Sequence, residues 1–142
     1  MAHHLSIFME NQPGKLERIT RILAEEKINL RAISLASGGD FGVLKILVTE
    51  PERAATVLRE HKVTVSSRKI VMALIDDEPG GFHRVLELLS SNGLNLQDCY
   101  GFVLESRKTA AIVIEAENIP DAEQRLVAAG YQLLTDAEIY AL

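Results

Sequence analysis

The sequence contains one cysteine, Cys99, and no tryptophan. A single cysteine excludes an internal disulfide and any metal or redox motif built on paired cysteines. Aromatic residues make up only 5% of the chain. Phe8 and Phe41 are too few and too scattered for an RNA-binding sheet, which needs stacking residues on adjacent central strands.

Long apolar runs and basic clusters are absent as well. No apolar run approaches the roughly 20 residues that a membrane helix needs, and residues 1–5 lack the pattern of a signal peptide. The chain carries 15 basic and 20 acidic residues, a net charge of −5, and no run of three basic residues. Nucleic acids and anionic membranes both require a basic face. We therefore expect a soluble cytoplasmic protein with no nucleic-acid and no membrane partner.

The chain does contain an internal repeat. Asn11-Gln12-Pro13-Gly14 lies 66 positions before Asp77-Glu78-Pro79-Gly80, and Ile28-Asn29-Leu30 lies 66 positions before Leu94-Asn95-Leu96. Beyond the next expected hairpin the offset becomes 68. A shift of two residues inside a loop is typical of two copies of one fold, because loops absorb insertions. A repeat of this length has the size of a small domain.

Apolar periodicity and turn residues predict the order strand, helix, strand, strand, helix, strand in each copy. Pro51 and Pro120 fit the first turn of the second helix, where a missing N–H costs nothing. The expected elements of the first copy are residues 5–10, 15–27, 30–36, 41–49, 51–61 and 63–65. Those of the second are 70–75, 81–91, 96–104, 109–116, 120–130 and 131–134, with a possible edge strand at 137–142.

This order predicts an α+β fold of two tandem ferredoxin-like β-α-β-β-α-β units, residues 1–68 and 69–142. Each unit has an antiparallel sheet with both helices on one face. Residues 43–48 and 71–75 are apolar at almost every position, whereas the helices cover only one face. The other face, or an edge, must be covered by the sister copy or by a second chain, and we expect a two-fold homodimer.

The repeated turn between the first strand and the first helix is the strongest candidate binding site. Gly14 and Gly80 have no Cβ, so that a ligand can approach the backbone, and the first N–H groups of the helix point at the same place. Those donors suit a carboxylate, while Asn11 and Asp77 can accept hydrogen bonds from an ammonium group. The turn therefore suits a free amino acid. The structural alternative is a Pro-Gly turn whose Asn or Asp caps the helix.

Asn29 and Asn95, where the first helix passes into the second strand, are a second matched pair. Asparagine often ends a helix because it tolerates left-handed backbone angles. The functional alternative places these amides at the edge of a binding groove, beside Leu30 and Leu96 of the second strand.

We expect no catalytic residues, no cofactor and no metal site. His61 and His83 lie at unmatched positions, and Ser66-Ser67 lacks the context of a nucleophile elbow. The acidic run Asp76-Asp77-Glu78 has a counterpart, Glu10-Asn11-Gln12, with a single charge. A solvated turn is therefore favoured over a metal site.

With Asp77-Glu78-Pro79-Gly80 after its first strand and Leu94-Asn95-Leu96 after its first helix, the doubled unit resembles a tandem ACT-domain protein over almost the whole chain. The first copy departs from the family pattern at Asn11, where an acid is usual. The resemblance implies a small-molecule sensor that binds an amino acid between paired domains, at the first loop of one and the second strand of its neighbour. It also implies a free-standing regulatory protein, because the two copies occupy the chain.

Two hypotheses follow for the function. In the first, the protein is a non-catalytic, allosteric module that binds a free amino acid at the repeated turn and at the Asn-Leu passage. The residues concerned are Asn11, Gln12, Pro13, Gly14, Asn29 and Leu30, with Asp77, Glu78, Pro79, Gly80, Asn95 and Leu96. In the second, the paired sheets dock onto a metabolic enzyme and no ligand is retained.

Overall fold

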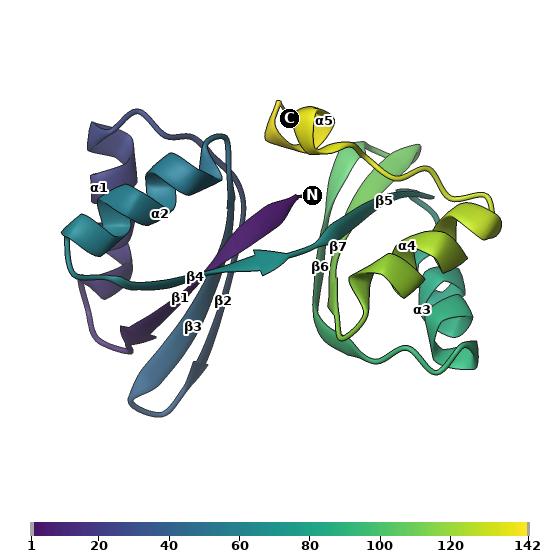
Figure 1. Ribbon diagram of the computed structural model, residues 1–142, viewed down its shortest axis with the longest axis horizontal. Coiled ribbons are helices and arrows are strands. Elements are labelled where there is room, and N and C mark those ends of the chain that lie inside the picture. The colour runs from purple at the N-terminus through teal and green to yellow at the C-terminus, as the bar shows by residue number, and fades with distance from the viewer. Residues whose placement is uncertain (1, 142) are drawn as a thin grey trace. The chain divides into compact units, whose positions relative to one another are not determined.

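The computed structural model describes residues 2–141, which form two compact units, mainly His3–Arg68 and Lys69–Ile139 (Figure 1). The first contains β1 (His3–Glu10), α1 (Lys15–Glu25), β2 (Leu30–Gly38), β3 (Phe41–Val48), α2 (Pro51–Glu60) and β4 (Thr64–Lys69). The second contains β5 (Val71–Asp76), α3 (Gly81–Ser91), β6 (Leu96–Glu105), β7 (Thr109–Ala116), α4 (Ile119–Ala128) and α5 (Asp136–Tyr140). The predicted fold class, two tandem ferredoxin-like units, is confirmed.

The first sheet has the strand order β2-β3-β1-β4, and β3 pairs antiparallel with both β1 and β2. Helices α1 and α2 lie together on one face of it (Figure 1). Leu5 and Ile7 of β1 are fully buried toward this face with Leu44 of β3, as the apolar periodicity of residues 5–10 predicts. Each such side chain contributes roughly 1.5–3 kcal/mol of transfer free energy on burial.

Helix α1 ends at Glu25, two residues earlier than the sequence predicts. Lys27 takes a left-handed conformation, with φ 58°. The N–H of Ile28 then donates to the Leu23 carbonyl at 2.9 Å and closes the helix end. The apolar periodicity that predicts this helix is confirmed, because Ile19 and Leu23 lie on one face and are buried in the core.

Phe8 and Phe41 are neighbours in space, because β1 and β3 are adjacent strands. Their rings stack with centroids 5.0 Å apart and an interplanar angle of 19°. The prediction that these rings are too scattered to lie on adjacent strands is therefore wrong. They are exposed but packed on each other, and the net charge of −5 remains the argument against a nucleic-acid partner.

The second sheet has the order β5-β7-β6, with a core that includes Val71, Ala73, Ile112 and Ile114 beneath α3 and α4. The strand predicted at 131–134 is reduced to a single antiparallel bridge between Ala73 and Leu133. Among the described residues, no helix is long and apolar enough to cross a membrane.

The edge strand expected at 137–142 is absent from residues 137–141, and residue 142 lies outside the described residues. Residues 137–141 lie mostly in helix α5, which a reciprocal cap opens. The N–H of Glu138 donates to Oγ1 of Thr135 at 3.2 Å, and the N–H of Thr135 donates to Oε2 of Glu138 at 2.7 Å. This capping box turns the chain away from the sheet directly after Leu134. The turn also explains why residues 131–134 pair with β5 only through the single bridge of Leu133 with Ala73.

The cap of helix α4 gives a first testable prediction. Oδ1 of Asn118 accepts a hydrogen bond from the N–H of Asp121 at 3.1 Å. Asn118→Ala removes this acceptor and should lower the free energy of unfolding by about 1 kcal/mol, whereas Asn118→Ser should retain most of the stability. Urea denaturation of the three proteins measures the difference, and equal midpoints for all three would show that the cap is unimportant.

Candidate functional site

Both candidate turns place a left-handed glycine directly before a helix. Gly14 has φ 87° before α1, and Gly80 has φ 83° before α3. Any side chain with a Cβ is strained in this region. This backbone conformation directs the first N–H groups of the helix toward the turn. In the described part of the chain, the N–H groups of Phe82 and His83 have no hydrogen-bond partner. The second turn therefore presents two free donors at the positive end of α3.

A further glycine, Gly81, makes the second turn tighter than the first. A Cβ at Gly81 would lie 2.3 Å from the carbonyl oxygen of Asp76, which no real side chain tolerates. The equivalent position in the first unit is Lys15. The internal repeat predicted the shared glycines, Gly14 and Gly80. It did not predict the role of Gly81, although Gly80-Gly81 aligns with Gly14-Lys15 in the sequence.

Asp77 and Asn11 tie each turn to the hairpin of the same unit. Oδ2 of Asp77 accepts from the N–H of Arg107 at 2.7 Å. Nδ2 of Asn11 donates to the carbonyl of Gly39 at 2.9 Å. Both residues therefore have a structural role, but not the predicted one of capping the helix: the N-cap residues are Gly14 and Gly80, and no side chain caps either helix. Within the described residues, Oδ1 of Asp77 has no protein partner and remains available to an ammonium group.

The remaining residues of the turns are exposed. Glu78 forms an ion pair with Arg84 of α3. A Cβ placed on Gly80 would lie 3.5 Å from Nη1 of Arg84, so that this guanidinium lies beside the turn. Gln12, Pro13 and Pro79 expose their side chains. The sequence did not indicate a role for Arg84 at the turn, because its equivalent in the first unit, Arg18, gives no sign of an ion pair.

An apolar cavity of about 270 Å³ opens beside the second turn. Ile75 precedes the turn and Phe82 follows it, while β6 and β7 supply the rest of the lining: Cys99, Tyr100, Gly101, Phe102, Val103, Ala110, Ala111 and Ile112. Gly101 pairs with Ile112, just as Leu35 pairs with Leu44 in the first unit. Glycine in place of leucine leaves the space unfilled. The feature of the sequence that could have indicated this cavity is Gly101, a glycine inside an apolar strand.

Asn29 and Asn95 do not lie beside these turns. Each follows the far end of an eleven-residue helix, which puts it roughly 16 Å from the turn of its own unit. The N–H of Thr49 donates to the Asn29 carbonyl at 3.1 Å, and the Asn29 N–H donates to Oγ1 of Thr49 at 3.3 Å. Leu30 and Leu96 pack against the cores. Within one unit, the predicted site residues therefore form two separate groups.

Comparison with known proteins identifies the family. The family model described as an ACT domain pair matches residues 1–142. The chain belongs to the ACT domain pair family. Comparison with curated proteins gave no match.

Among solved structures, protein BT0572 from Bacteroides thetaiotaomicron is 33% identical, with a TM-score of 0.92 over 99% of this chain and 96% of that one. The regulatory subunit of aspartate kinase from Thermus thermophilus, in its ligand-free form, is 18% identical, with a TM-score of 0.67 over 90% and 92%. The corresponding subunit from Thermus flavus is 17% identical, with a TM-score of 0.61 over 91% and 93%. The last two share the fold of this ACT domain pair.

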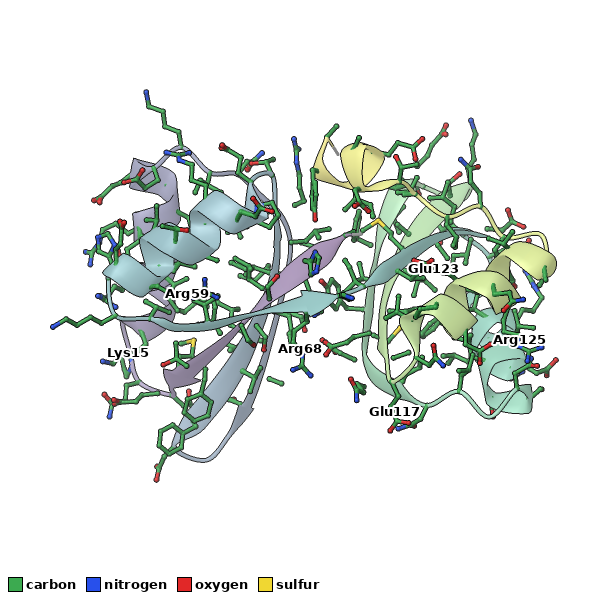
Figure 2. All side chains as sticks on the ribbon, in the orientation of Figure 1. Lys15, Arg59, Arg68, Glu117, Glu123 and Arg125 are labelled. Carbon is green, nitrogen blue, oxygen red and sulfur yellow. The ribbon has the colours of Figure 1, made fainter. Side chains whose placement is uncertain are left out.

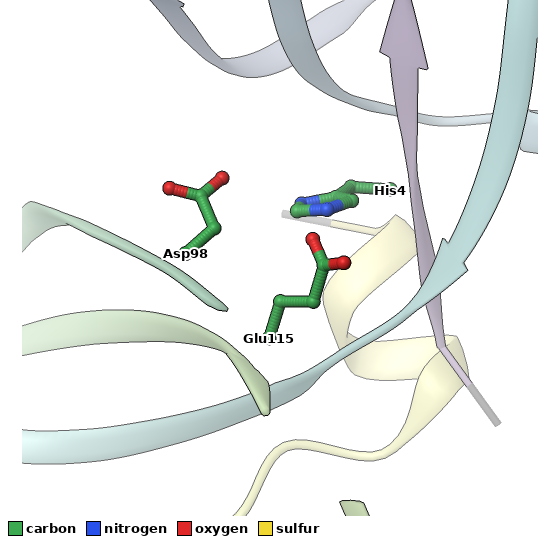
Figure 3. Close-up of side chains that lie close together, drawn as sticks. All are labelled: His4, Asp98 and Glu115. Atoms are coloured by element: carbon green, nitrogen blue, oxygen red, sulfur yellow. The ribbon is translucent and has the colours of Figure 1, made fainter. Parts of the chain in front are cut away.

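Two carboxylates face each other in the second ACT unit, away from the acidic run of the turn. Asp98 of β6 lies directly opposite Glu115 of β7 in the antiparallel pairing of the two strands (Figure 3). Oδ1 of Asp98 also accepts from the N–H of Cys99 at 2.9 Å. Burial raises the pKa of the Cys99 thiol to about 11, and the negative charge of Asp98 adds to the effect. The lone cysteine of the ACT pair is therefore held as a neutral thiol.

The raised pKa of Cys99 predicts slow alkylation. Relative to a thiol of pKa 9.0, a pKa of about 11 reduces the thiolate fraction at pH 8 roughly 100-fold. Iodoacetamide modification should be slow at pH 7 and should accelerate close to tenfold per pH unit up to pH 10, because only the thiolate reacts. The urea-unfolded chain serves as the control. A rate that levels off below pH 9 in the folded protein would contradict the raised pKa.

Proposed function

We propose that this ACT domain pair is a non-catalytic regulatory protein of the cytoplasm that senses a free amino acid at the turn Asp77–Gly80. The observation that carries the proposal is the pair of free N–H groups at Phe82 and His83, reached past a glycine with φ 83°. The family and the regulatory-subunit relatives with the same fold support a regulatory role.

The polar groups of the turn match the two charged ends of an amino acid. The N–H groups of Phe82 and His83 suit its carboxylate, since backbone donors at a helix start bind anions. The free Oδ1 of Asp77 suits its ammonium group through a charge-assisted hydrogen bond. Because Oδ2 of Asp77 is held by the N–H of Arg107, the carboxylate is already oriented before a ligand arrives.

The adjoining cavity suggests which side chain the ligand carries. Its volume of about 270 Å³ and its lining by Ile75, Phe82, Gly101 and Val103 suit an apolar side chain. We therefore infer a preference for leucine-like or methionine-like amino acids over charged ones. In the first unit, Leu35 replaces Gly101 and Asn11 replaces Asp77, so that its turn should bind more weakly.

A neighbouring domain would complete such a site. ACT domains pair, and the proposed role of Asn29, Leu30, Asn95 and Leu96 is to line a groove formed with a neighbour's second strand. The second strands β2 and β6 are edge strands with exposed apolar residues, including Leu35 and Val103. Such edges favour association. We therefore propose a homodimer as the sensing form.

A thermal-shift panel tests amino-acid binding. Apolar amino acids should raise the melting temperature by several degrees at 100 times their dissociation constant, where ligand binding adds about 2.7 kcal/mol. The matched organic acids and amines should have no effect, because each lacks one of the two charged groups. A flat panel with folded protein would favour the alternative function, a ligand-free module that docks onto a metabolic enzyme.

Three variants locate the bound amino acid. Asp77→Asn keeps an oxygen for the N–H of Arg107 but removes the charge, and should weaken binding about 5- to 20-fold. Gly80→Ala should abolish or strongly weaken binding, because its methyl group blocks the helix start. Gly14→Ala is the matched control: its φ of 87° gives a similar strain, yet ligand affinity should be unchanged. Equal losses from Gly14→Ala and Gly80→Ala would contradict the assignment to the second turn.

Sedimentation equilibrium tests the homodimer. At micromolar concentration we expect a species with twice the 15.7 kDa of one chain. A charge on an exposed edge residue, Val103→Lys on β6, should shift the equilibrium toward the monomer, whereas Val127→Lys on the exposed face of α4 should not. A single 15.7 kDa species in the wild type would exclude the dimer as the sensing form.

A further inference from the structure

A second cavity, in the first ACT unit, is lined by three basic side chains and one acid. It has a volume of about 250 Å³ and lies where the end of β1 and the start of α1 meet the chain that enters β4. Its charged residues are Lys15, Arg18, Lys62 and Glu10, and its other residues are Phe8, Met9, Ile19, Phe41, Val63 and Thr64. The cavity therefore carries a formal charge of +2 in a protein whose net charge is −5.

The three cations come from two segments of the chain. Lys15 is the first residue of α1 (Figure 2), and Arg18 lies one turn further along it. Lys62 follows the end of α2. Nη2 of Arg18 donates to the His61 carbonyl at 2.7 Å, which fixes the guanidinium at the cavity wall. Within the described residues, neither Lys15 nor Lys62 forms an ion pair.

The second unit has an equivalent cavity without these charges. This space of about 370 Å³ is lined by Leu74, Ile75, Asp76, Thr109, Ala129, Gly130, Tyr131 and Gln132. Gly81 stands where the first unit has Lys15, and Gly130 stands where it has Lys62. Arg84, the equivalent of Arg18, is paired with Glu78. The fold therefore requires the cavity but not the cations, which are a property of the first unit.

The backbone at Lys62 is left-handed, a conformation in which lysine is less favourable than the glycine of the second unit. Lys62 has φ 62°, and its equivalent Gly130 has φ 89°. A non-glycine residue is strained in this region, and the favourable position of a cation near a helix C-terminus offsets only part of that strain. Lys27 has the same conformation after α1, with φ 58°, but does not line the cavity. Lys27 therefore offers a control for the effect of replacing a lysine that has left-handed backbone angles.

We propose that this cavity binds a small doubly charged oxyanion, such as a phosphate monoester or a short dicarboxylate. Two flexible ammonium groups and one fixed guanidinium suit such a group, because arginine presents a fork of donors and lysine a mobile point charge. The apolar wall of Met9, Ile19 and Val63 accommodates a short carbon chain. This site is separate from the proposed amino-acid site and would give the protein a second input signal.

Isothermal titration calorimetry with inorganic phosphate and with succinate tests the proposal, with chloride and acetate at matched ionic strength as references. The double variant Lys15→Ala/Lys62→Gly should weaken binding at least tenfold, because it removes both ammonium groups. Glycine at 62 suits the left-handed backbone, so that the fold is retained. The control Lys27→Gly removes a lysine from the same conformation and should change the affinity less than twofold.

Three results would overturn the anion site. The first is the absence of phosphate and succinate binding beyond that of chloride at the same ionic strength. The second is an equal loss of affinity in Lys27→Gly, which would assign the effect to the overall charge. The third is undiminished binding by a folded Lys15→Ala/Lys62→Gly protein. Retained amino-acid binding in this double variant would show that the two sites are independent.

Discussion

The left-handed glycine before the first helix of each unit is the constraint on which the rest of the structure depends. With φ near +85° at Gly14 and Gly80, the chain reverses from the first strand of each unit into a helix that covers the same sheet. The reversal leaves helix N–H groups facing the turn, because no side chain caps them. A folding requirement and a set of free donors for a ligand therefore arise from the same two residues.

Duplication of this unit gives one backbone fold with two different sets of side chains around the turn. Gly101 leaves a cavity beside the turn of the second unit, where the first unit has Leu35, and the tight turn at Gly81 stands where the first unit has Lys15. The second unit therefore presents backbone donors beside an apolar cavity, and the first presents a cationic cavity. The strand pairing at Leu35 and at Gly101 is the same in the two units.

The sequence predicted the helices and strands well where apolar periodicity and repeat offset agree. It failed after Gly130, where the capping box of Thr135 and Glu138 competes with strand pairing. The paired glycines were predictable as turn residues because φ > 0 requires them. The stacking of Phe8 on Phe41 and the cavity above Gly101 depend on strand register, which apolar alternation does not fix across a hairpin.

The backbone amide signals of the two helix starts test the central claim most directly. In a ¹⁵N-labelled protein titrated with leucine or methionine, the amides of Phe82 and His83 should shift most, in step with calorimetric saturation. Those of Leu16 and Glu17, the equivalent amides of α1, should shift far less. Unchanged signals at Phe82 and His83 during saturable binding would contradict the account, because the ligand carboxylate would then be bound elsewhere.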